Sequence, residues 1–371
     1  MAKSPAKPPL AGLLSPLVAL VALIAVAVGA ARRDPERSPL AEADGAVAAV
    51  PSRPPPALLR RVDEFQRARP FWGFLFGVAK KFGDDRAGNL AALVSYFGFF
   101  SLFPLLVALT SVLGFVLADN EKLRAEITNG AAEQIPFIGD TISKNVGELK
   151  GSVVVIVVGL LGAIWAGLRV IDAIQNALNE VWDVPIAGRP KLVTRRLRGL
   201  VALGLLAIGL AGSFAATAVA GFLPDLPGAS SLVIFLLTFL YNVVVFLLAF
   251  KILSELDHPY SELFPGALVA AAGWTLSQSF GIVYMTRQLA KAEATYKDFG
   301  TVIALLSFLF LGSQIVILAA EVNVVRARKL WPRSLAPAAG LTDADRRAFA
   351  YYADSQRRVE GQRIRVDYPA T

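Results

Sequence analysis

The chain has 371 residues, of which 55% are apolar and only 18% are charged. An average soluble domain has about 45 to 50% apolar and about 25% charged residues, so an ordinary soluble fold and a disordered chain are both excluded. The chain has no cysteine and a single histidine, His258, which excludes thiol catalysis and leaves few ligands for a metal. Its net charge of +8 suits nucleic acid or anionic lipid equally until the charges are located.

Near the start of the chain, residues 8–31 form an uncharged apolar run between two lysines and the Arg32–Arg33 pair. We interpret residues 1–31 as an extra membrane span with an external amino terminus. A cleaved signal peptide and a start-site artefact stay open as alternatives. Residues 32–61 are rich in proline, alanine and charge, which indicates a linker.

The segment 62–89 mixes aromatic side chains such as Phe71 and Trp72 with basic ones such as Lys80 and Lys81. Such a pattern predicts an amphipathic helix at the membrane surface, with its basic groups facing anionic lipid head groups. A packed helix beneath the membrane domain is the alternative.

Six further stretches have the length and apolarity of membrane spans, since crossing about 30 Å of hydrocarbon takes roughly 20 residues. They predict an all-α, polytopic transmembrane bundle over residues 90–325, with the possible extra span before it. The expected core spans are 90–117, 152–178, 198–222, 231–252, 263–286 and 301–325.

The basic residues predict the orientation of this bundle. With both ends of the core inside, segments 32–86, 180–198, 251–262 and 326–371 hold 27 lysines and arginines, whereas the outer segments hold 7. Cytoplasmic loops carry the excess of positive charge, so residues 326–371 are expected to form a basic cytoplasmic tail. Residues 344–366 are too charged to fold alone, which favours a solvated tail.

Polar side chains at membrane depth are the candidate functional residues, because each unpaired group there is costly. Asn242 and Gln314 lie near the middle of their spans by helical rise. Single interhelical hydrogen bonds are the alternative explanation. The uncharged candidates are Tyr96, Tyr241, Asn242, Gln278 and Gln314.

A charged group is predicted from similar depths in two spans. Arg169 and Glu321 both lie near the inner end of their helices, so we expect them to pair. Asp172 would complete a cluster of three charges, and Asn176 and Asn179 continue the same helical face. The alternative is that Arg169 reaches the inner interface and pairs locally with Asp172.

Four stretches resemble the YihY/BrkB family of bacterial inner-membrane proteins, which includes YhjD-like proteins and was once labelled ribonuclease BN. The stretches are LVSYFGFFSLFPLLVAL at 93–109, AIQNALNEVWDVP at 173–185, LFPGALVAAAGW at 263–274, and FGTVIA at 299–304 with AAEVN at 319–323. The resemblance covers about residues 71–329. It implies a multi-pass protein of the inner membrane with a role in envelope integrity.

The residues themselves offer little for an enzyme. Glu255, Asp257 and His258 could hold one weak ion, but a solvated turn explains them better, and the chain has no nucleotide or nucleophile motif. We therefore disfavour a ribonuclease and expect no cofactor, no metal and no nucleic acid partner. Transport or flipping of an amphiphilic envelope component is the favoured function, and a membrane scaffold that binds a partner is the alternative.

Overall fold

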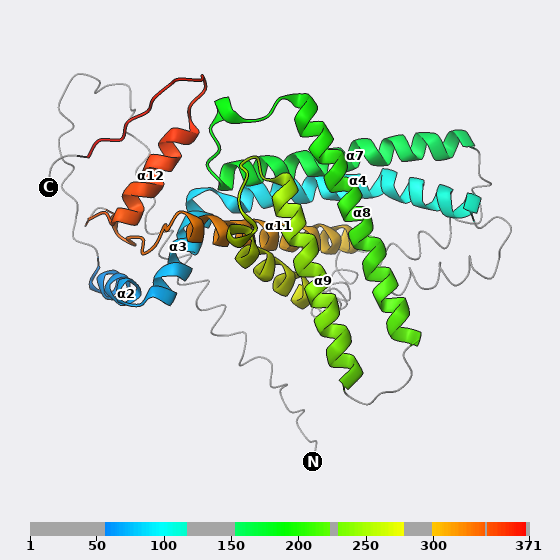
Figure 1. The fold of residues 1–371 in the computed structure, drawn as a ribbon, viewed down its shortest axis with the longest axis horizontal. Coiled ribbons are helices and arrows are strands. Elements are labelled where there is room, and N and C mark those ends of the chain that lie inside the picture. Colours follow the sequence, from blue (N-terminus) through cyan, green and yellow to red (C-terminus); the bar gives the residue numbers. More distant parts are fainter. Residues whose placement is uncertain (1–55, 117–152, 223–228, 278–298, 338–339, 369–371) are drawn as a thin grey trace, which may run out of the picture. The chain divides into compact units, whose positions relative to one another are not determined.

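The computed structural model describes residues 56–116, 153–222, 229–277, 299–337 and 340–368. The predicted span within 1–31, most of the linker, and the predicted outer segment 119–150 lie outside them. Every regular element in the described ranges is helical, as predicted (Figure 1). The elements are α2 (Ala57–Ala68), α3 (Pro70–Asp84), α4 (Ala87–Val116), α7 (Val153–Val181), η1 (Ile186–Gly188), α8 (Leu192–Phe222), α9 (Ala229–Leu253), a helical segment at 260–277, α11 (Phe299–Ala327) and α12 (Asp343–Ser355).

Four stretches of these helices are long and apolar enough to cross a membrane, among the residues described. They are Ala87–Leu109, Ile156–Val181, Phe235–Leu253 and Val302–Ala327. The other two predicted core spans also fall on helix: 198–222 lies in α8, and 263–286 begins in the segment 260–277. In the described residues the chain is therefore all-helical, and four of its helices could cross a membrane.

The chain divides into two compact units. The small unit is Met1–Ala68 with Ser334–Leu341, and the large unit is Arg69–Arg333 with Thr342–Thr371. Within the small unit, Asp63 on α2 accepts a hydrogen bond from the backbone N–H of Leu335 at 2.9 Å and pairs with Arg67 at 2.6 Å.

The predicted amphipathic segment 62–89 is two helices rather than one. Arg69 is extended, with φ −126° and ψ 110°, and Pro70 begins α3. Proline has no N–H to continue a helix and disfavours helical geometry in the residue before it, so α2 ends at Ala68 and a new helix starts.

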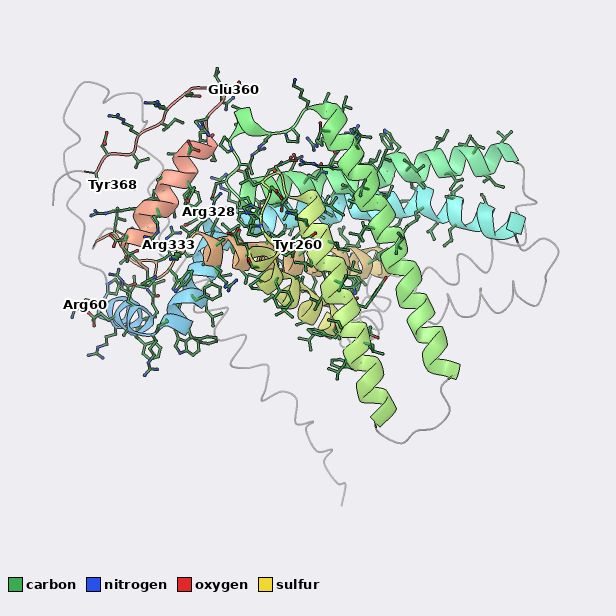
Figure 2. All side chains as sticks on the ribbon, in the orientation of Figure 1. Arg60, Tyr260, Arg328, Arg333, Glu360 and Tyr368 are labelled. Carbon is green, nitrogen blue, oxygen red and sulfur yellow. The ribbon has the colours of Figure 1, made fainter. Side chains whose placement is uncertain are left out.

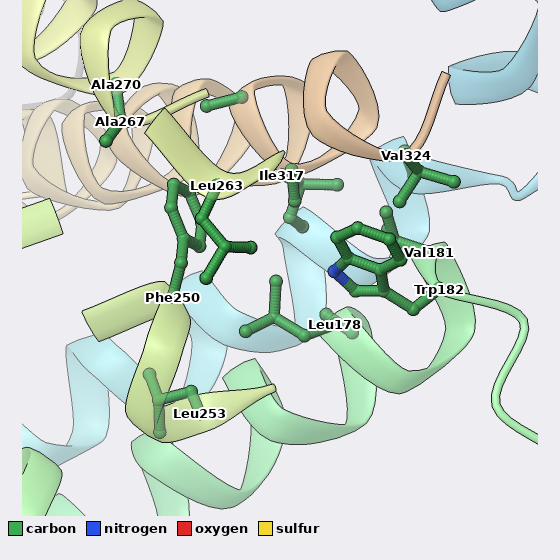
Figure 3. Packing of buried hydrophobic residues seen from close by; sticks show 14 of the residues in the cluster. Leu178, Val181, Trp182, Phe250, Leu253, Leu263, Ala267, Ala270, Ile317 and Val324 are labelled. Carbon is green, nitrogen blue, oxygen red and sulfur yellow. The ribbon is translucent and has the colours of Figure 1, made fainter. Parts of the chain in front are cut away.

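The large unit buries its apolar side chains where the helices meet. Helix α4 packs on α7 and α11, and α8 packs on α9. Figure 3 shows part of the resulting core, in which Phe250 and Leu263 lie together and Trp182 lies beside Val324. The outward faces are also apolar, with Val154 69% exposed and Ile208 68% exposed. Such faces suit hydrocarbon rather than water.

Small residues bring the membrane helices close together. A Cβ added at Gly159 on α7 would lie 3.3 Å from the Cα of Ala108 on α4, and one added at Gly162 would lie 3.5 Å from Pro104. Glycine and alanine are enriched at such contacts because they allow two backbones to approach. Pro104 lies inside α4 without ending it.

The segment 260–277 is hydrogen-bonded to α11 at the point where a proline interrupts its own helical hydrogen bonds. Pro265 has no N–H for the carbonyl of Ser261 one turn earlier, and Arg326 of α11 donates to that carbonyl at 3.0 Å instead. The next N–H, of Gly266, donates to the side chain of Asn323 at 2.6 Å. A Cβ on Gly266 would overlap Asn323 and the carbonyl of Ala319, so glycine is needed at this contact.

Candidate functional site

Polar contacts join the ends of several helices on one side of the large unit. Arg195 near the start of α8 pairs with Asp172 near the end of α7 at 3.1 Å, and Arg198 of α8 pairs with Glu255 just after α9. Lys81 of α3 lies 3.5 Å from Asp183, which follows α7. We call this region, with the Arg326–Ser261 contact and α12, the charged layer.

A buried cluster lies at the centre of the charged layer. The ammonium of Lys81 lies 2.5 Å from Asp85, 3.5 Å from Asp183 and 3.8 Å from Glu321. The guanidinium of Arg328 donates to Asp183 at 2.6 Å and to the carbonyl of Trp182. Lys81 and Glu321 are fully buried. We call Lys81, Asp85, Asp183, Glu321 and Arg328 the lysine cluster.

The backbone positions the cluster through three left-handed residues at helix ends. Lys81 and Asp85 are one turn apart, so they share a face of α3, and Arg86 turns the chain into α4 with φ 52°. Asp183 follows α7 with φ 47°, and Lys329 follows α11 with φ 52°. Asp tolerates this conformation better than most residues. At each of these points the chain turns away from a helix end beside the cluster.

Burial and mutual charge set the protonation of the cluster. Burial alone lowers the pKa of Lys81, but the carboxyls of Glu321, Asp183 and Asp85 raise it above its ordinary value. Burial raises the pKa of Asp85 to about 6 in spite of Lys81, and it raises the pKa of Asp183 in spite of Lys81 and Arg328. Lys81 is therefore charged, and the carboxyls compete for its charge.

A second buried network attaches α12 to α3. Arg333 donates to Asp345 at 2.6 Å and to Asp84 at 3.0 Å, and Lys80 lies 3.5 Å from Asp345. Figure 2 labels Arg328 and Arg333 between the end of α11 and the beginning of α12. Helix α12 also contacts the lysine cluster, because the Lys81 ammonium lies 5.3 Å from the centre of the Tyr352 ring.

This network corrects the prediction of a solvated tail. Residues 343–355 form a helix whose Ala344, Asp345 and Ala348 are buried. Thr342 caps the helix by accepting from the N–H of Asp345, whose carboxylate accepts from the N–H of Thr342. The segment has too few apolar residues to fold alone, but the contacts of Asp345 with Arg333 and Lys80 tie it to the rest of the large unit.

The predicted pair of Arg169 and Glu321 is not found in the part of the chain that the structure describes. Arg169 is exposed and lies 5.2 Å from the ring of Trp165 on its own helix, whereas Glu321 faces Lys81. Similar depth along two helices does not establish that two side chains face each other. The prediction placed Glu321 in a charged cluster correctly and gave it the wrong partner.

The other predicted residues of α7 have separate partners. Asp172 pairs with Arg196 at 2.8 Å as well as with Arg195, and not with Arg169. Asn179 is buried and hydrogen-bonds Glu255. Asn176 is half-buried on the same helix.

The uncharged candidates do not converge on one site. Tyr241 of α9 donates to the carbonyl of Gly209 on α8 at 2.9 Å, which makes it a bond between two helices. Tyr96 is 53% exposed and lies among phenylalanines of α4. Asn242 is buried, Gln314 is half-buried, and Gln278 lies outside the described residues.

The loop after α9 directs its three candidate ligands to different partners. Glu255 pairs with Arg198, and Asp257 pairs with Lys251. His258 stacks on Trp182 with ring centroids 3.6 Å apart and lies 3.0 Å from Glu262, and burial lowers its pKa. A pocket of about 400 Å³ lies beside this loop, lined by Leu197, Arg198, Val201, Lys251, Ile252, Ser254, Glu255, Leu256 and Asp257.

Four residues of the lysine cluster were not predicted as a site: Lys81, Asp85, Asp183 and Arg328. A signal was nevertheless present in the sequence. Asp183 and Glu321 both belong to stretches that carry the family resemblance, and Lys81 and Asp85 have the one-turn spacing of a helical ion pair. What no pattern showed is that these separate stretches meet.

These features define a multi-pass helical membrane protein with a buried charged layer at one end of its helices. The chain belongs to the family described as virulence factor BrkB, whose model matches residues 78–339 and so includes the whole lysine cluster. This confirms the family resemblance.

Two of the following relatives are named as membrane proteins. The chain is 26% identical over 160 residues to the inner membrane protein YhjD of Escherichia coli K12, which covers 41% of this chain and 48% of that protein. It is 24% identical over 276 residues to a UPF0761 membrane protein of Pseudoalteromonas translucida, and the match covers 71% of this chain and 88% of that protein. It is also 22% identical over 271 residues to YfkH of Bacillus subtilis, which is named a putative ribonuclease-like protein. That match covers 70% of this chain and 97% of that protein. No solved structure matches the chain.

Proposed function

We propose that the protein crosses the bacterial inner membrane six times, with its charged layer and carboxyl terminus in the cytoplasm. The excess of basic residues in the segments 32–86, 180–198, 251–262 and 326–371 supports this orientation. The contacts of the charged layer support the number of spans. They join the end of α3, which leads into α4, and the starts of α8 and of segment 260–277 to the ends of α7, α9 and α11. This arrangement is expected of helices that alternate in direction.

At the surface of this layer, α3 is proposed to lie at the interface with anionic lipid. Phe71, Trp72 and Leu75 are exposed on α3, where they can enter the acyl boundary.

The proposed activity is transport or flipping of an amphiphilic component of the cell envelope. The observation that carries this proposal is the lysine cluster, in which three buried carboxyls face two cations at the ends of membrane helices. Buried ion networks are a weak source of stability, because apolar side chains of similar volume often serve as well or better. Ionisable residues in membrane helices instead mark substrate paths and ion paths, and Glu321 on α11 is such a residue.

A membrane scaffold is the second candidate, and the pocket beside the loop after α9 favours it. A path for an amphiphile would need a wide opening lined by unpaired basic groups. This pocket is only about 400 Å³, and its Arg198 and Lys251 are paired with Glu255 and Asp257. Because both of its cations are already neutralised by carboxylates, the pocket would attract an anionic head group only weakly.

Reconstituted vesicles separate the two candidates. Purified protein would be inserted into vesicles of phosphatidylethanolamine and phosphatidylglycerol that carry fluorescent phosphatidylglycerol in both leaflets, and an impermeant reductant would then be added. A flippase makes more of the probe accessible than protein-free vesicles do, and Lys81→Met should abolish the gain.

Arg196→Met is the matched control, because it also removes one positive charge but from a side chain that is 42% exposed. It should leave the gain unchanged. If the wild-type protein moves no probe, the flipping proposal fails for this lipid class and the scaffold is favoured.

A further inference from the structure

The three carboxyls of the lysine cluster differ in the donors they receive. Asp85 accepts from Lys81 at 2.5 Å, and Asp183 accepts from Arg328 at 2.6 Å. Glu321 is fully buried, and neither of its oxygens receives a hydrogen bond from an N–H donor in the described residues. Its distance of 3.8 Å from the Lys81 ammonium is too long for one.

Glu321 does lie in hydrogen-bonding position to another acid, Asp85. Two ionised carboxylates only accept hydrogen bonds, so this contact requires a proton on one of them. The count of charges leads to the same conclusion. Three ionised carboxyls against Lys81 and Arg328 would leave one uncompensated negative charge in a buried site, which is strongly unfavourable.

We propose that Asp85 and Glu321 form a proton-binding site, in which Glu321 carries one proton at neutral pH and donates it in a hydrogen bond to Asp85. Glu321 is assigned the proton because Asp85 has the ammonium at hydrogen-bonding distance and Glu321 does not. Burial is the main cause of the raised pKa of Asp85, and the negative charge of Asp183 raises it further. This inference does not depend on whether the protein transports anything.

The proton joins two elements that are far apart in the chain. Asp85 ends α3 and Glu321 belongs to α11, so loss of the proton would place two like charges against each other across the α3–α11 contact. Protonation therefore holds this contact closed, and deprotonation favours its opening. Among the charged and titratable groups around the pair, Lys81 and Asp183 act on both acids, and Tyr352 faces Asp85. Arg328 and Glu180 lie beside Asp183, and Asp84 and Arg333 lie beside Tyr352.

Infrared spectroscopy of the full-length protein in detergent tests the site, because a protonated carboxyl has a C=O stretching band that a carboxylate lacks. We expect one such band from a buried group at neutral pH. Glu321→Gln should abolish it. Asp85→Asn should abolish it too, because two carboxylates then balance two cations and Glu321 ionises against Lys81.

The control is Glu180→Gln, which removes an acid that is 49% exposed and should leave the band in place. Absence of the band from the wild-type protein at neutral pH would overturn the proposal, and so would a band that survives Glu321→Gln. A band that survives Asp85→Asn would show that the proton does not depend on the pair. The Asp85→Asn protein decides the matter if Glu321→Gln fails to fold.

Discussion

At the residue scale, Lys81 is the centre of the charged layer because its ammonium faces three buried carboxyls. Lys81→Met removes that charge and leaves the carboxyls with Arg328 alone among the cluster's cations. Loss of one partner from a buried charge network costs about 3 to 5 kcal/mol, so the folded yield and melting temperature in detergent should fall clearly.

The same loss of charge at an exposed site provides the comparison. Arg196→Met removes a surface partner of Asp172, which keeps Arg195, and should cost less than about 1 kcal/mol. Equal melting temperatures for the two variants would show that the lysine cluster does not stabilise the fold.

The pKa of Asp85 predicts how stability depends on pH. Folding raises this pKa from 3.8 to about 6, so the folded state binds the proton more tightly than the unfolded state. The contribution is therefore fully present below pH 3.8 and is lost as the pH rises through about 6. Melting temperatures across this range should fall with rising pH, and Asp85→Asn should remove part of the slope. Asp354→Asn, at an exposed ion pair, should keep the whole slope.

At the element scale, α12 depends on the rest of the large unit for its structure. Arg333→Met would remove the cation that lies 2.6 Å from the buried carboxylate of Asp345, and should cost about 3 to 5 kcal/mol. Limited proteolysis should then cut within 343–355. Arg347→Met, which removes a donor on the exposed side of the same helix, should leave α12 resistant. Equal resistance in both variants would show that Arg333 does not hold the helix.

The contact between the segment 260–277 and α11 depends on Gly266. Gly266→Ala would push a methyl group against the carbonyl of Ala319 and should cost about 1 to 3 kcal/mol, measured by melting in detergent. Gly204 lies in α8 with nothing within 4 Å of an added Cβ, so Gly204→Ala should stabilise its helix slightly. A neutral Gly266→Ala would contradict the close approach.

The helices were predictable from the sequence and most of the site was not. A membrane span leaves a continuous apolar run, so α4, α7 and α11 lie within a few residues of their predicted limits. Pairing across the charged layer leaves no such pattern. Lys81, Asp183 and Glu321 are about a hundred residues or more apart, and left-handed turns at Arg86 and Asp183 help to bring them together. An apolar run also does not show how a helix is rotated about its own axis. This is why Arg169 was assigned a partner that it does not face.

At the scale of the whole molecule, charge is separated along the helix axes. The described middles of the membrane helices carry few charged residues, whereas the lysine cluster, the Arg333 network and the pairs of α7, α8 and α9 gather at one end. This separation is what a bilayer imposes on a helical protein, since charge is tolerated at its surface and costly inside. The central claim is that this end faces the cytoplasm.

Cysteine labelling in intact cells tests that claim most directly, because the native chain has no cysteine. Gly188→Cys places a thiol on an exposed turn of the charged layer, and Asn129→Cys places one in the predicted outer segment 119–150. With an impermeant reagent, we expect the thiol at 129 to be labelled at once and the thiol at 188 to be labelled only after the membrane is permeabilised. Labelling at 188 in intact cells, with protection at 129, would contradict the proposed orientation.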